Sequence, residues 1–182
     1  MNFKFEKVSR FKDIDLELPC RKTKGSAGYD FVVAEDIIIP PYNELMANLD
    51  FQVFNQCEEK VIYSLQEMEK ITKSAKARPT LIPTGVKTYM PEGFYLELSV
   101  RSSCPLKYWI IMANGEGIID SDYADNPANE GEIFFQVINL SPVPIKLQKG
   151  ETIGQGIFKR YYVVDDDKST ASRVGGFGST NG

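Results

Sequence analysis

The sequence contains no histidine among its 182 residues. This absence excludes nucleophilic catalysis by a Ser–His or Cys–His pair, and it removes the commonest metal-binding side chain. Any catalysis by this chain must therefore use carboxylates, hydroxyl groups, arginines, backbone amides or an ion that is bound by oxygen atoms.

Cysteines and long apolar runs are also scarce. The three cysteines, Cys20, Cys57 and Cys104, lie far apart and lack the spacing of a metal site. No apolar stretch approaches the roughly 20 residues that a membrane-spanning helix needs, and charged residues stand near the N-terminus, where a signal peptide would be apolar. We therefore expect a cytoplasmic protein in a reducing compartment that does not associate with membranes.

An excess of basic residues is missing as well. The chain has 21 Lys and Arg against 25 Asp and Glu, which gives a formal net charge of −4. Non-specific binding of nucleic acid depends on a basic surface, so this charge indicates that nucleic acid is not a partner.

The pattern of apolar residues is typical of an all-β protein. Phe94, Leu96, Leu98 and Val100 alternate with polar residues, which predicts a strand with one buried face. Further strands are expected over short apolar runs separated by proline and glycine, at residues 31–33, 37–39, 109–112, 133–138, 143–147 and 153–164. Many short strands joined by turns indicate a sandwich, a jelly roll or a barrel.

A chain of this length is expected to form one domain with its own core, over residues 1–172. Apolar and charged residues also alternate in the first part of the chain, through Ile14, Leu16 and Leu18, and this spacing predicts edge strands. Residues 173–182 are too rich in glycine to pack as an element, so we expect a flexible C-terminal arm.

The segment from about residue 44 to 78 differs from its surroundings. Val61, Leu65, Met68 and Thr72 recur at helical spacing among charged residues, which predicts at least one amphipathic helix in a surface insertion. A surface insertion of this kind is a candidate site for a protein partner.

The segment from Asn114 to Tyr123 gathers residues that suit a binding site. Its two glycines allow a tight turn and a close approach of the backbone to a ligand. We expect Ile118 and Ile119 to anchor the arm of this hairpin in the core, with Asp120 at its end. A carboxylate there can orient a water molecule or a sugar hydroxyl beside the tyrosine ring. The same residues also suit an ordinary solvated turn between two strands.

Five segments resemble, in order, the five sequence motifs of the homotrimeric dUTPase family, whose members split dUTP into dUMP and pyrophosphate. They are Ser26–Asp30, Arg101–Ser103, Asn114–Tyr123, Lys149–Gln155 and Arg173–Gly182. Each motif alone is common, whereas all five in the right order are specific. The resemblance implies an all-β, jelly-roll-like dUTPase fold with a helical insertion and a glycine-rich C-terminal arm that closes the active site.

The chain departs from the family pattern in several places. Val100 precedes the second motif, where the family often has proline, and the helical insertion is additional. Residues 124–130 are inserted between the third motif and the next strand. The arm is one residue shorter than its commonest form between Arg173 and Phe177. None of these departures removes a charge that the chemistry needs.

The resemblance also implies a role for each catalytic residue. Asp120 would receive the deoxyribose 3′-hydroxyl and orient the attacking water, and Gln155 would hold that water or a phosphate oxygen. Arg101, Ser102 and Ser103 would bind the phosphates.

The implied cofactor is Mg²⁺, which would be bound by the phosphates and by water. Asp30 would contact the hydrated ion through a water molecule. The implied assembly is a homotrimer in which each active site is shared between subunits.

The hairpin and the arm would select the nucleotide. Groups at Asn114, Gly117 and Ile119 would match the donor and acceptor edge of uracil. Tyr123 would pack under the sugar and leave no space for a 2′-hydroxyl. The arm residues implied to bind dUTP are Arg173 at the terminal phosphate, Phe177 stacked on the base, Gly178 and Ser179.

Two other functions stay open. A dCTP deaminase of the same superfamily also has an Arg-Ser-Ser element, but its general base is a glutamate at the position that aligns with Gln136, and an amide cannot take up a proton in that way. A regulatory or binding protein on the same scaffold would use the 44–78 insertion to contact a partner.

Overall fold

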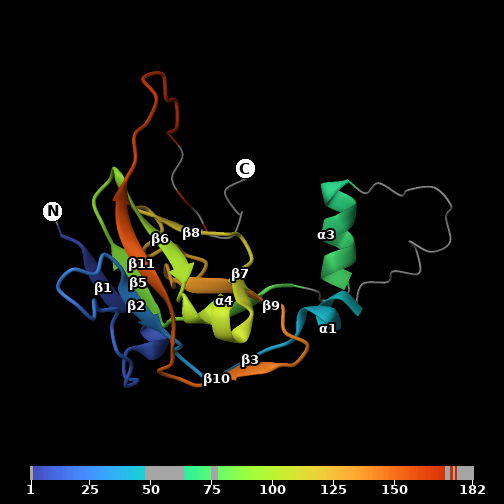
Figure 1. Ribbon diagram of the computed structural model, residues 1–182. Coiled ribbons are helices and arrows are strands. Elements are labelled where there is room, and N and C mark those ends of the chain that lie inside the picture. Colours follow the sequence, from blue (N-terminus) through green and yellow to red (C-terminus); the bar gives the residue numbers. More distant parts are fainter. Residues whose placement is uncertain (1, 48–63, 75–77, 171–172, 174, 176–182) are drawn as a thin grey trace.

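The computed structural model describes residues 2–47, 64–74, 78–170, 173 and 175, and the structural statements below concern these residues. Strands dominate the regular structure and the helices are short (Figure 1), so the all-β class expected from the sequence is confirmed. The strands are β1 (Lys4–Lys7), β2 (Tyr29–Val32), β3 (Ile37–Ile39), β4 (Thr80–Pro83), β5 (Val86–Tyr89), β6 (Phe94–Val100), β7 (Ile110–Met112), β8 (Gly117–Asp120), β9 (Phe134–Asn139), β10 (Ile145–Leu147) and β11 (Thr152–Arg160). The helical elements are η1, a 3-10 turn at Ser9–Phe11, α1 (Tyr42–Ala47), α3 (Leu65–Ser74) and α4 (Ser103–Tyr108).

Antiparallel strands form two main sheets. One has the strand order β2-β11-β6-β8 and the other has the order β4-β9-β7. Two short pairs, β1 with β5 and β3 with β10, complete the sheets of the described residues. In β6, Leu96 and Leu98 are fully buried while Tyr95, Glu97 and Ser99 are only partly buried, as the alternation predicts.

A glycine allows the two main sheets to approach closely. Phe31 of β2 and Phe135 of β9 meet edge to face, with their ring centroids 5.7 Å apart. A Cβ atom on Gly154 of β11 would stand 2.1 Å from the Phe135 ring and 2.5 Å from the backbone oxygen of Ser99. Because Gly154 precedes Gln155, the packing of the core fixes the backbone beside a predicted site residue.

Of the edge strands expected over residues 1–23, β1 is formed at Lys4–Lys7, whereas the alternation through Ile14, Leu16 and Leu18 gives no strand. The chain turns there, and the backbone N–H of Ile14 donates to the oxygen of Phe11 at 3.1 Å. Leu16 is buried, whereas Leu18 is 41% exposed. The alternation through Ile14, Leu16 and Leu18 therefore reflects the burial of the Leu16 side chain in a segment that is not a hydrogen-bonded strand.

Strand β11 ends earlier than expected, at Arg160 instead of Val164. Its neighbour β6 begins at Phe94, directly opposite Arg160, so the ladder between them stops there. Residues 161–164 are exposed, and Tyr162 has 89% of its surface accessible.

Helix α4 was not expected, because only strands were predicted after residue 81. Its sequence contains a helix-start signal, because two serines stand before Pro105 and proline is tolerated in the first helical turn. The helix ends where Trp109 adopts a left-handed backbone conformation with φ of 57°. Since α4 begins just after Arg101, it positions the second predicted motif.

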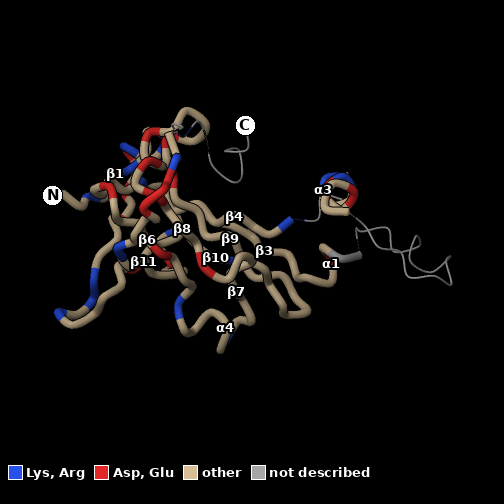
Figure 2. The backbone as a smooth tube through the Cα atoms, turned by 90° about the horizontal axis from the view of Figure 1, so that it is seen from above, with Lys and Arg blue, Asp and Glu red and all other residues tan. Residues whose placement is uncertain are grey.

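The helix predicted in the 44–78 insertion is present as α3. Of the residues predicted to lie at helical spacing, Val61 is outside the described residues. The helix begins at a capping box, in which Ser64 Oγ accepts from the Glu67 N–H at 3.3 Å and the Glu67 carboxylate accepts from the Ser64 N–H at 2.8 Å. Leu65 is 90% exposed, and Figure 2 shows charged residues around α3. None of the described helices is long and apolar enough to cross a membrane.

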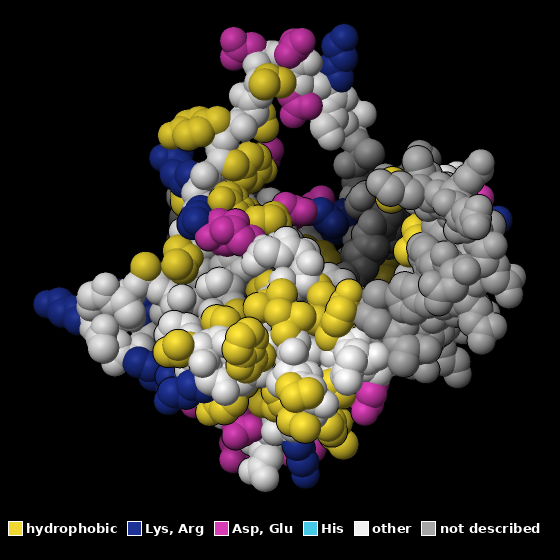
Figure 3. All heavy atoms as spheres, turned by 45° about the vertical axis from the view of Figure 1, so that its right-hand side comes forward, with side chains coloured by type: hydrophobic (Ala, Val, Ile, Leu, Met, Phe, Trp, Pro, Cys, Tyr) yellow, Lys and Arg dark blue, Asp and Glu magenta, His cyan; other side chains and the backbone are white. Residues whose placement is uncertain are grey.

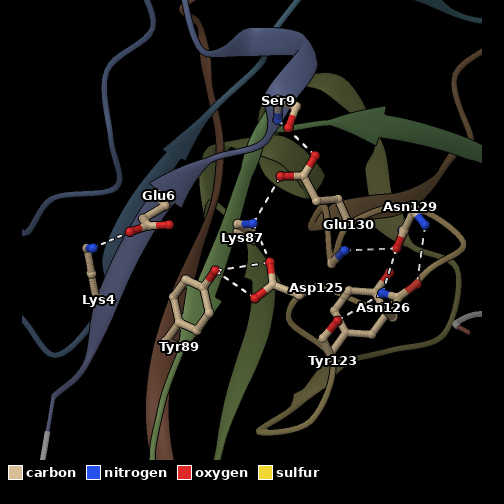
Figure 4. A network of polar contacts seen from close by, with 11 residues as sticks. Lys4, Glu6, Ser9, Lys87, Tyr89, Tyr123, Asp125, Asn126, Asn129 and Glu130 are labelled. Carbon is tan, nitrogen blue, oxygen red and sulfur yellow. Dashed lines mark hydrogen bonds and ion pairs between the residues drawn. The ribbon is translucent and has the colours of Figure 1, made fainter. Parts of the chain in front are cut away.

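A charged cluster holds the inserted segment that follows the third motif (Figure 4). The Lys87 side chain on β5 is only 8% exposed, and it pairs with Asp125 and, at 3.0 Å, with Glu130. Tyr89 donates a hydrogen bond to the Asp125 carboxylate at 2.9 Å, and Glu130 accepts one from the Ser9 backbone N–H at 2.9 Å. The segment is therefore tied to the sheet near both of its ends.

The cluster predicts a pH-dependent contribution to stability. The Lys87 hydrogen bond lowers the pKa of Asp125, and the Ser9 amide together with Lys87 lowers the pKa of Glu130, from ordinary values of 3.8 and 4.5. Both pKa values are lower in the folded protein than in the unfolded chain. The cluster therefore stabilises the folded protein when the pH is above the ordinary pKa values, and this stabilisation is lost as the pH falls through the folded-state pKa values. We expect Lys87→Met to melt at a lower temperature than wild type near neutral pH, by a deficit that shrinks between about pH 5 and about pH 3.

A deficit that stays constant over that pH range would contradict the ion-pair explanation. Lys4→Met is a suitable control, because it removes a lysine from an exposed pair with Glu6. Exposed pairs contribute little, so this variant should melt close to wild type at every pH tested.

Candidate active site

Strand β8 carries the hairpin that the sequence singles out. It pairs with β6 so that Gly117 lies opposite Leu98 and Asp120 lies opposite Tyr95. A Cβ atom on Gly117 would stand 3.1 Å from the Leu98 side chain. A larger residue at position 117 would therefore press against a buried leucine of the central strand.

A pocket of about 320 Å³ opens beside this hairpin. Predicted substrate-binding residues on its wall are Asn114, Gly117, Ile119, Tyr123 and Arg173. The structure thus brings together five side chains or backbone positions that are scattered over 60 positions of the sequence (114 to 173).

One of the two isoleucines of β8 does not anchor the hairpin. Ile119 packs against the hydrophobic core, whereas Ile118 is 51% exposed. Successive side chains of a strand point to opposite faces of the sheet, so both cannot enter the same core. The expectation is therefore wrong for Ile118.

Tyr123 forms a rigid part of the pocket wall. The residue is 7% exposed, its hydroxyl donates to the backbone oxygen of Glu132 at 3.2 Å, and it accepts a hydrogen bond from Asn129 at 2.7 Å. Burial raises the pKa of the Tyr123 phenol. The hydroxyl stays protonated near neutral pH, so both hydrogen bonds persist.

Arg173 lies over the Tyr123 ring, with its guanidinium carbon 5.7 Å from the ring centroid. It forms ion pairs with Asp120 and, at 2.7 Å, with Asp122. Asp122 was expected to be structural, although the Asp-Ser-Asp spacing places two carboxylates at one turn. In the structure these two carboxylates are partners of Arg173.

A second group of predicted site residues lies on the neighbouring strands β2 and β11. Gln155 of β11 stands between Asp30 of β2 and Ser99 of β6 in the register of the sheet. Both Asp30 and Gln155 are partly exposed. A carboxylate and an amide are thus presented side by side at the surface of the sheet.

The Arg-Ser-Ser motif lies where β6 passes into α4. The backbone N–H of Arg101 donates to the oxygen of Ile153 at 3.0 Å, and its carbonyl accepts from the N–H of Cys104 at 2.8 Å. Arg101 and Ser102 are exposed, and Ser103 is partly exposed. Exposed polar side chains on a fixed backbone suit the binding of an anionic ligand.

Gly28, to which the sequence analysis gave no separate role, controls the space available to Gln155. A Cβ atom at this position would stand 2.3 Å from Gln155 Oε1 and 3.0 Å from its Cδ. The first and fourth motifs are therefore in direct contact. The glycine within the first motif was the available signal, but only the register of β2 with β11 identifies its neighbour.

The two groups lie toward opposite ends of β6. Asp120 is opposite Tyr95 and Gln155 is opposite Ser99. These positions are four residues apart, or about 13 Å along the strand, and β8 and β11 lie on opposite sides of β6. One chain therefore presents two half-sites, a pocket beside the hairpin and a polar group around Gln155.

Within the described ranges, no cluster of three or more Asp, Glu or Cys side chains is arranged to hold a metal ion by itself. Asp30 lies opposite Gln155 in the sheet register, and oxygen donors of this kind suit Mg²⁺ that keeps most of its water ligands. Three other predicted site residues lie outside the described residues, namely Phe177, Gly178 and Ser179.

Comparisons with known proteins identify the family. Residues 52–181 match the dUTPase family model. A relative from Lactococcus lactis subsp. lactis (strain IL1403), named deoxyuridine 5′-triphosphate nucleotidohydrolase, is 34% identical over 178 residues, which are 97% of this chain and 95% of the relative. The chain belongs to the dUTPase family. A relative of the same name from Fusobacterium nucleatum subsp. nucleatum is 29% identical and is matched over 95% of both chains.

The fold agrees with this dUTPase assignment. The crystal structure of a dUTPase from Streptococcus mutans matches with a TM-score of 0.66 and 33% sequence identity, over 88% of this chain and 98% of that one. The dUTPase fold implied by the five motifs is therefore confirmed.

The contact between Gly28 and Gln155 predicts a dUTPase variant that folds but works poorly. In Gly28→Ala the new methyl group would displace the end of the flexible Gln155 side chain, while the backbone stays in place. Misplacement of a group at the reacting centre by about 1 Å costs on the order of 10²-fold in rate. We expect such a loss in the rate of dUTP hydrolysis, with a melting temperature close to wild type.

Gly25→Ala is the matched control, because a Cβ atom there meets no atom within 4 Å. It should retain both the rate and the melting temperature. Equal rates for Gly28→Ala and Gly25→Ala would show that the position of Gln155 does not matter for the reaction.

Proposed function

We propose that this chain hydrolyses dUTP to dUMP and pyrophosphate by attack of water on the α-phosphorus. The observation that carries the proposal is the pocket beside the hairpin, which gathers Asn114, Gly117, Ile119 and Tyr123 with Arg173, the ion-pair partner of Asp120. The names of the relatives from Lactococcus lactis and Fusobacterium nucleatum support the same activity.

The catalytic residues of the proposal come from both half-sites. Asp120 receives the sugar 3′-hydroxyl and orients the attacking water, and Gln155 holds this water or a phosphate oxygen. Arg101, Ser102 and Ser103 bind the phosphates and stabilise the charge that develops on them. Phosphoryl transfer relies mainly on positioning and charge stabilisation, so a chain without histidine can carry it out.

Selectivity for the nucleotide follows from the narrow pocket. Backbone groups near Asn114 pair with the edge of uracil, and cytosine would leave buried groups unpaired at about 1–3 kcal/mol for each. Tyr123 excludes a 2′-hydroxyl. The arm of residues 173–182 closes the site, with Phe177 on the base, Gly178 and Ser179 beside it, and Arg173 on the terminal phosphate.

Mg²⁺ is the cofactor of the proposed reaction. When bound, it neutralises the charge of the triphosphate and of the pyrophosphate leaving group. Asp30 is the residue of this chain that would hold it, through a water ligand. Its partly exposed carboxylate, opposite the Gln155 amide, offers the oxygen chemistry that Mg²⁺ prefers.

We infer that the two half-sites meet in a homotrimer. They are too far apart on one chain to surround the same reacting centre, so a second subunit supplies the missing half. Exposed apolar side chains near α4 support such an assembly, since Leu106 is 78% and Trp109 63% exposed, and Figure 3 shows hydrophobic side chains gathered on one face. Leu140, also exposed, adjoins Trp109 through a backbone hydrogen bond of 2.9 Å.

The alternatives are less well supported. Gln136, which stands where a dCTP deaminase needs its glutamate, lines the hairpin pocket as an amide. A protein partner at the 44–78 insertion would be an addition to the enzyme. The scarcity of cysteine and the absence of metal spacing support a location in the cytoplasm.

Incubation with each dNTP and Mg²⁺ tests the proposed function. Pyrophosphate should appear from dUTP and only weakly from dCTP or dTTP, because the pocket pairs with the uracil edge. Comparable release from all of them would remove the specificity argument. Release of ammonia from dCTP would instead establish a deaminase.

A pair of variants tests the role of Asp120. Asp120→Asn should slow dUTP hydrolysis by about 10²–10⁴-fold, the usual effect of losing a positioned acid–base group, and should keep its fold. Asp122→Asn is the matched control, because Asp122 also pairs with Arg173. If both variants lose activity to the same extent, the loss is explained by the broken pairing with Arg173 and not by the acid–base chemistry of Asp120.

A further inference from the structure

The segment 124–130, which lengthens the third motif, folds into a hydrogen-bonded loop against Tyr123. Asp125 and Glu130 near its ends adopt left-handed backbone conformations, with φ of 58° and 60°. Non-glycine residues rarely adopt this conformation, and here both are held by Lys87 (Figure 4). The loop is therefore a specified structure and not a slack connection.

Asn126 holds the backbone of Tyr123 from inside this loop. Its residue surface is 4% exposed, and its Nδ2 donates to the backbone oxygen of Tyr123 at 2.8 Å and to Asn129 Oδ1 at 2.7 Å. Its Oδ1 accepts from the backbone N–H groups of Ala128 at 3.1 Å and Asn129 at 3.2 Å. All the hydrogen-bonding capacity of the Asn126 amide is used.

Asn129 holds the side chain of Tyr123. Its Nδ2 donates to the Tyr123 hydroxyl at 2.7 Å and to the backbone oxygen of Glu132 at 3.3 Å. Its Oδ1 accepts from Asn126 and, at 3.1 Å, from the backbone N–H of Gly131. The phenol, the two amides and the Glu132 carbonyl form one closed network.

We propose that Asn126 and Asn129 are positioning residues that fix Tyr123 and thereby set the preference of the enzyme for deoxyribose over ribose. The proposal rests on the proposed function, in which the Tyr123 ring fills the space of a 2′-hydroxyl. A ring can exclude a hydroxyl group only if it cannot move aside. Asn129 fixes the outer end of the ring and Asn126 fixes its backbone, so neither end is free to shift.

The energetic consequence is specific to the ribonucleotide. A neutral hydrogen bond of this kind is worth about a factor of ten in an equilibrium. If the bond from Asn129 is removed, the ring can move to admit a 2′-hydroxyl, and UTP gains more than dUTP does. Discrimination between the two nucleotides should fall even when the protein remains folded.

The experiment measures kcat/KM for dUTP and UTP in wild type, Asn129→Ala, Tyr123→Phe and the double variant. We expect Asn129→Ala to lower the dUTP/UTP ratio about tenfold. Tyr123→Phe removes the other partner of the same hydrogen bond and should lower the ratio as well. Because Asn129 acts through the phenol, adding Asn129→Ala to Tyr123→Phe should lower the ratio little further.

Asn139→Ala provides the matched control. Asn139 is fully buried, and its Nδ2 donates to the backbone oxygens of Ile39 at 3.2 Å and Val143 at 2.8 Å, away from Tyr123. This variant should lose stability, as any buried asparagine variant would, and should keep the wild-type dUTP/UTP ratio.

The outcomes separate this inference from the proposed function. A wild-type protein that fails to hydrolyse dUTP overturns the proposed function. The positioning role is overturned if the wild type is active and selective but Asn129→Ala leaves the dUTP/UTP ratio unchanged. It is also overturned if the effects of Asn129→Ala and Tyr123→Phe on this ratio multiply in the double variant as independent effects do. If Asn129→Ala does not fold, Tyr123→Phe decides alone, because an unchanged ratio in that variant shows that the phenol contact does not control selectivity.

Discussion

The register of β6 with its two neighbours determines where Asp120 and Gln155, one residue of each half-site, lie. On one side β6 pairs with β8, which places Asp120 opposite Tyr95. On the other side it pairs with β11, which places Gln155 opposite Ser99. A shift of one residue in either ladder would turn every side chain of that strand to the other face of the sheet. Apolar residues of the two neighbouring strands oppose such a shift, because Ile119 of β8 packs against the core and Ile153 of β11 is buried in it.

The polar contacts around Tyr123 add a second constraint, which acts on the ends of strands. Glu132 is 4% exposed and accepts hydrogen bonds from Arg10 and from the Gly85 backbone, both at 3.1 Å. Burial raises the pKa of Glu132, and the contact with Arg10 opposes this effect. Buried polar groups are stable only when all are satisfied. The pocket wall therefore depends on residues from the N-terminal turn, from the turn before β5 and from the inserted loop.

Much of the fold and part of the site could be predicted from the sequence. The alternation in β6 was sufficient to predict that strand, because one face of it is buried. The alternation through Ile14 and Leu18 was not sufficient, since it carries no information on whether a partner strand is available. Helix α4 was missed because its start signal at Pro105 is short and lies between two strands.

The limits of prediction for the site have the same origin. Local motifs indicated Asp30 and Gln155 separately, but their pairing, and the contact of Gly28 with Gln155, depend on strands that are more than 100 residues apart in the chain. The hydrogen-bond network of the inserted loop could not be predicted either, because Lys87 and Asp125 are 38 residues apart in the sequence. A sequence motif indicates which chemical groups are available, whereas the register of distant strands determines which motifs come into contact.

The position of Arg173 has a consequence for ligand affinity. Its side chain is 16% exposed and already holds two carboxylates. An anion that recruits this arginine competes with Asp120 and Asp122, so the free energy of binding includes the weakening of two existing ion pairs. Added salt weakens the existing ion pairs with Asp120 and Asp122 as well as the new ion pair with the anion. The affinity of this arginine for an incoming phosphate should therefore vary less with ionic strength than that of an unpaired arginine.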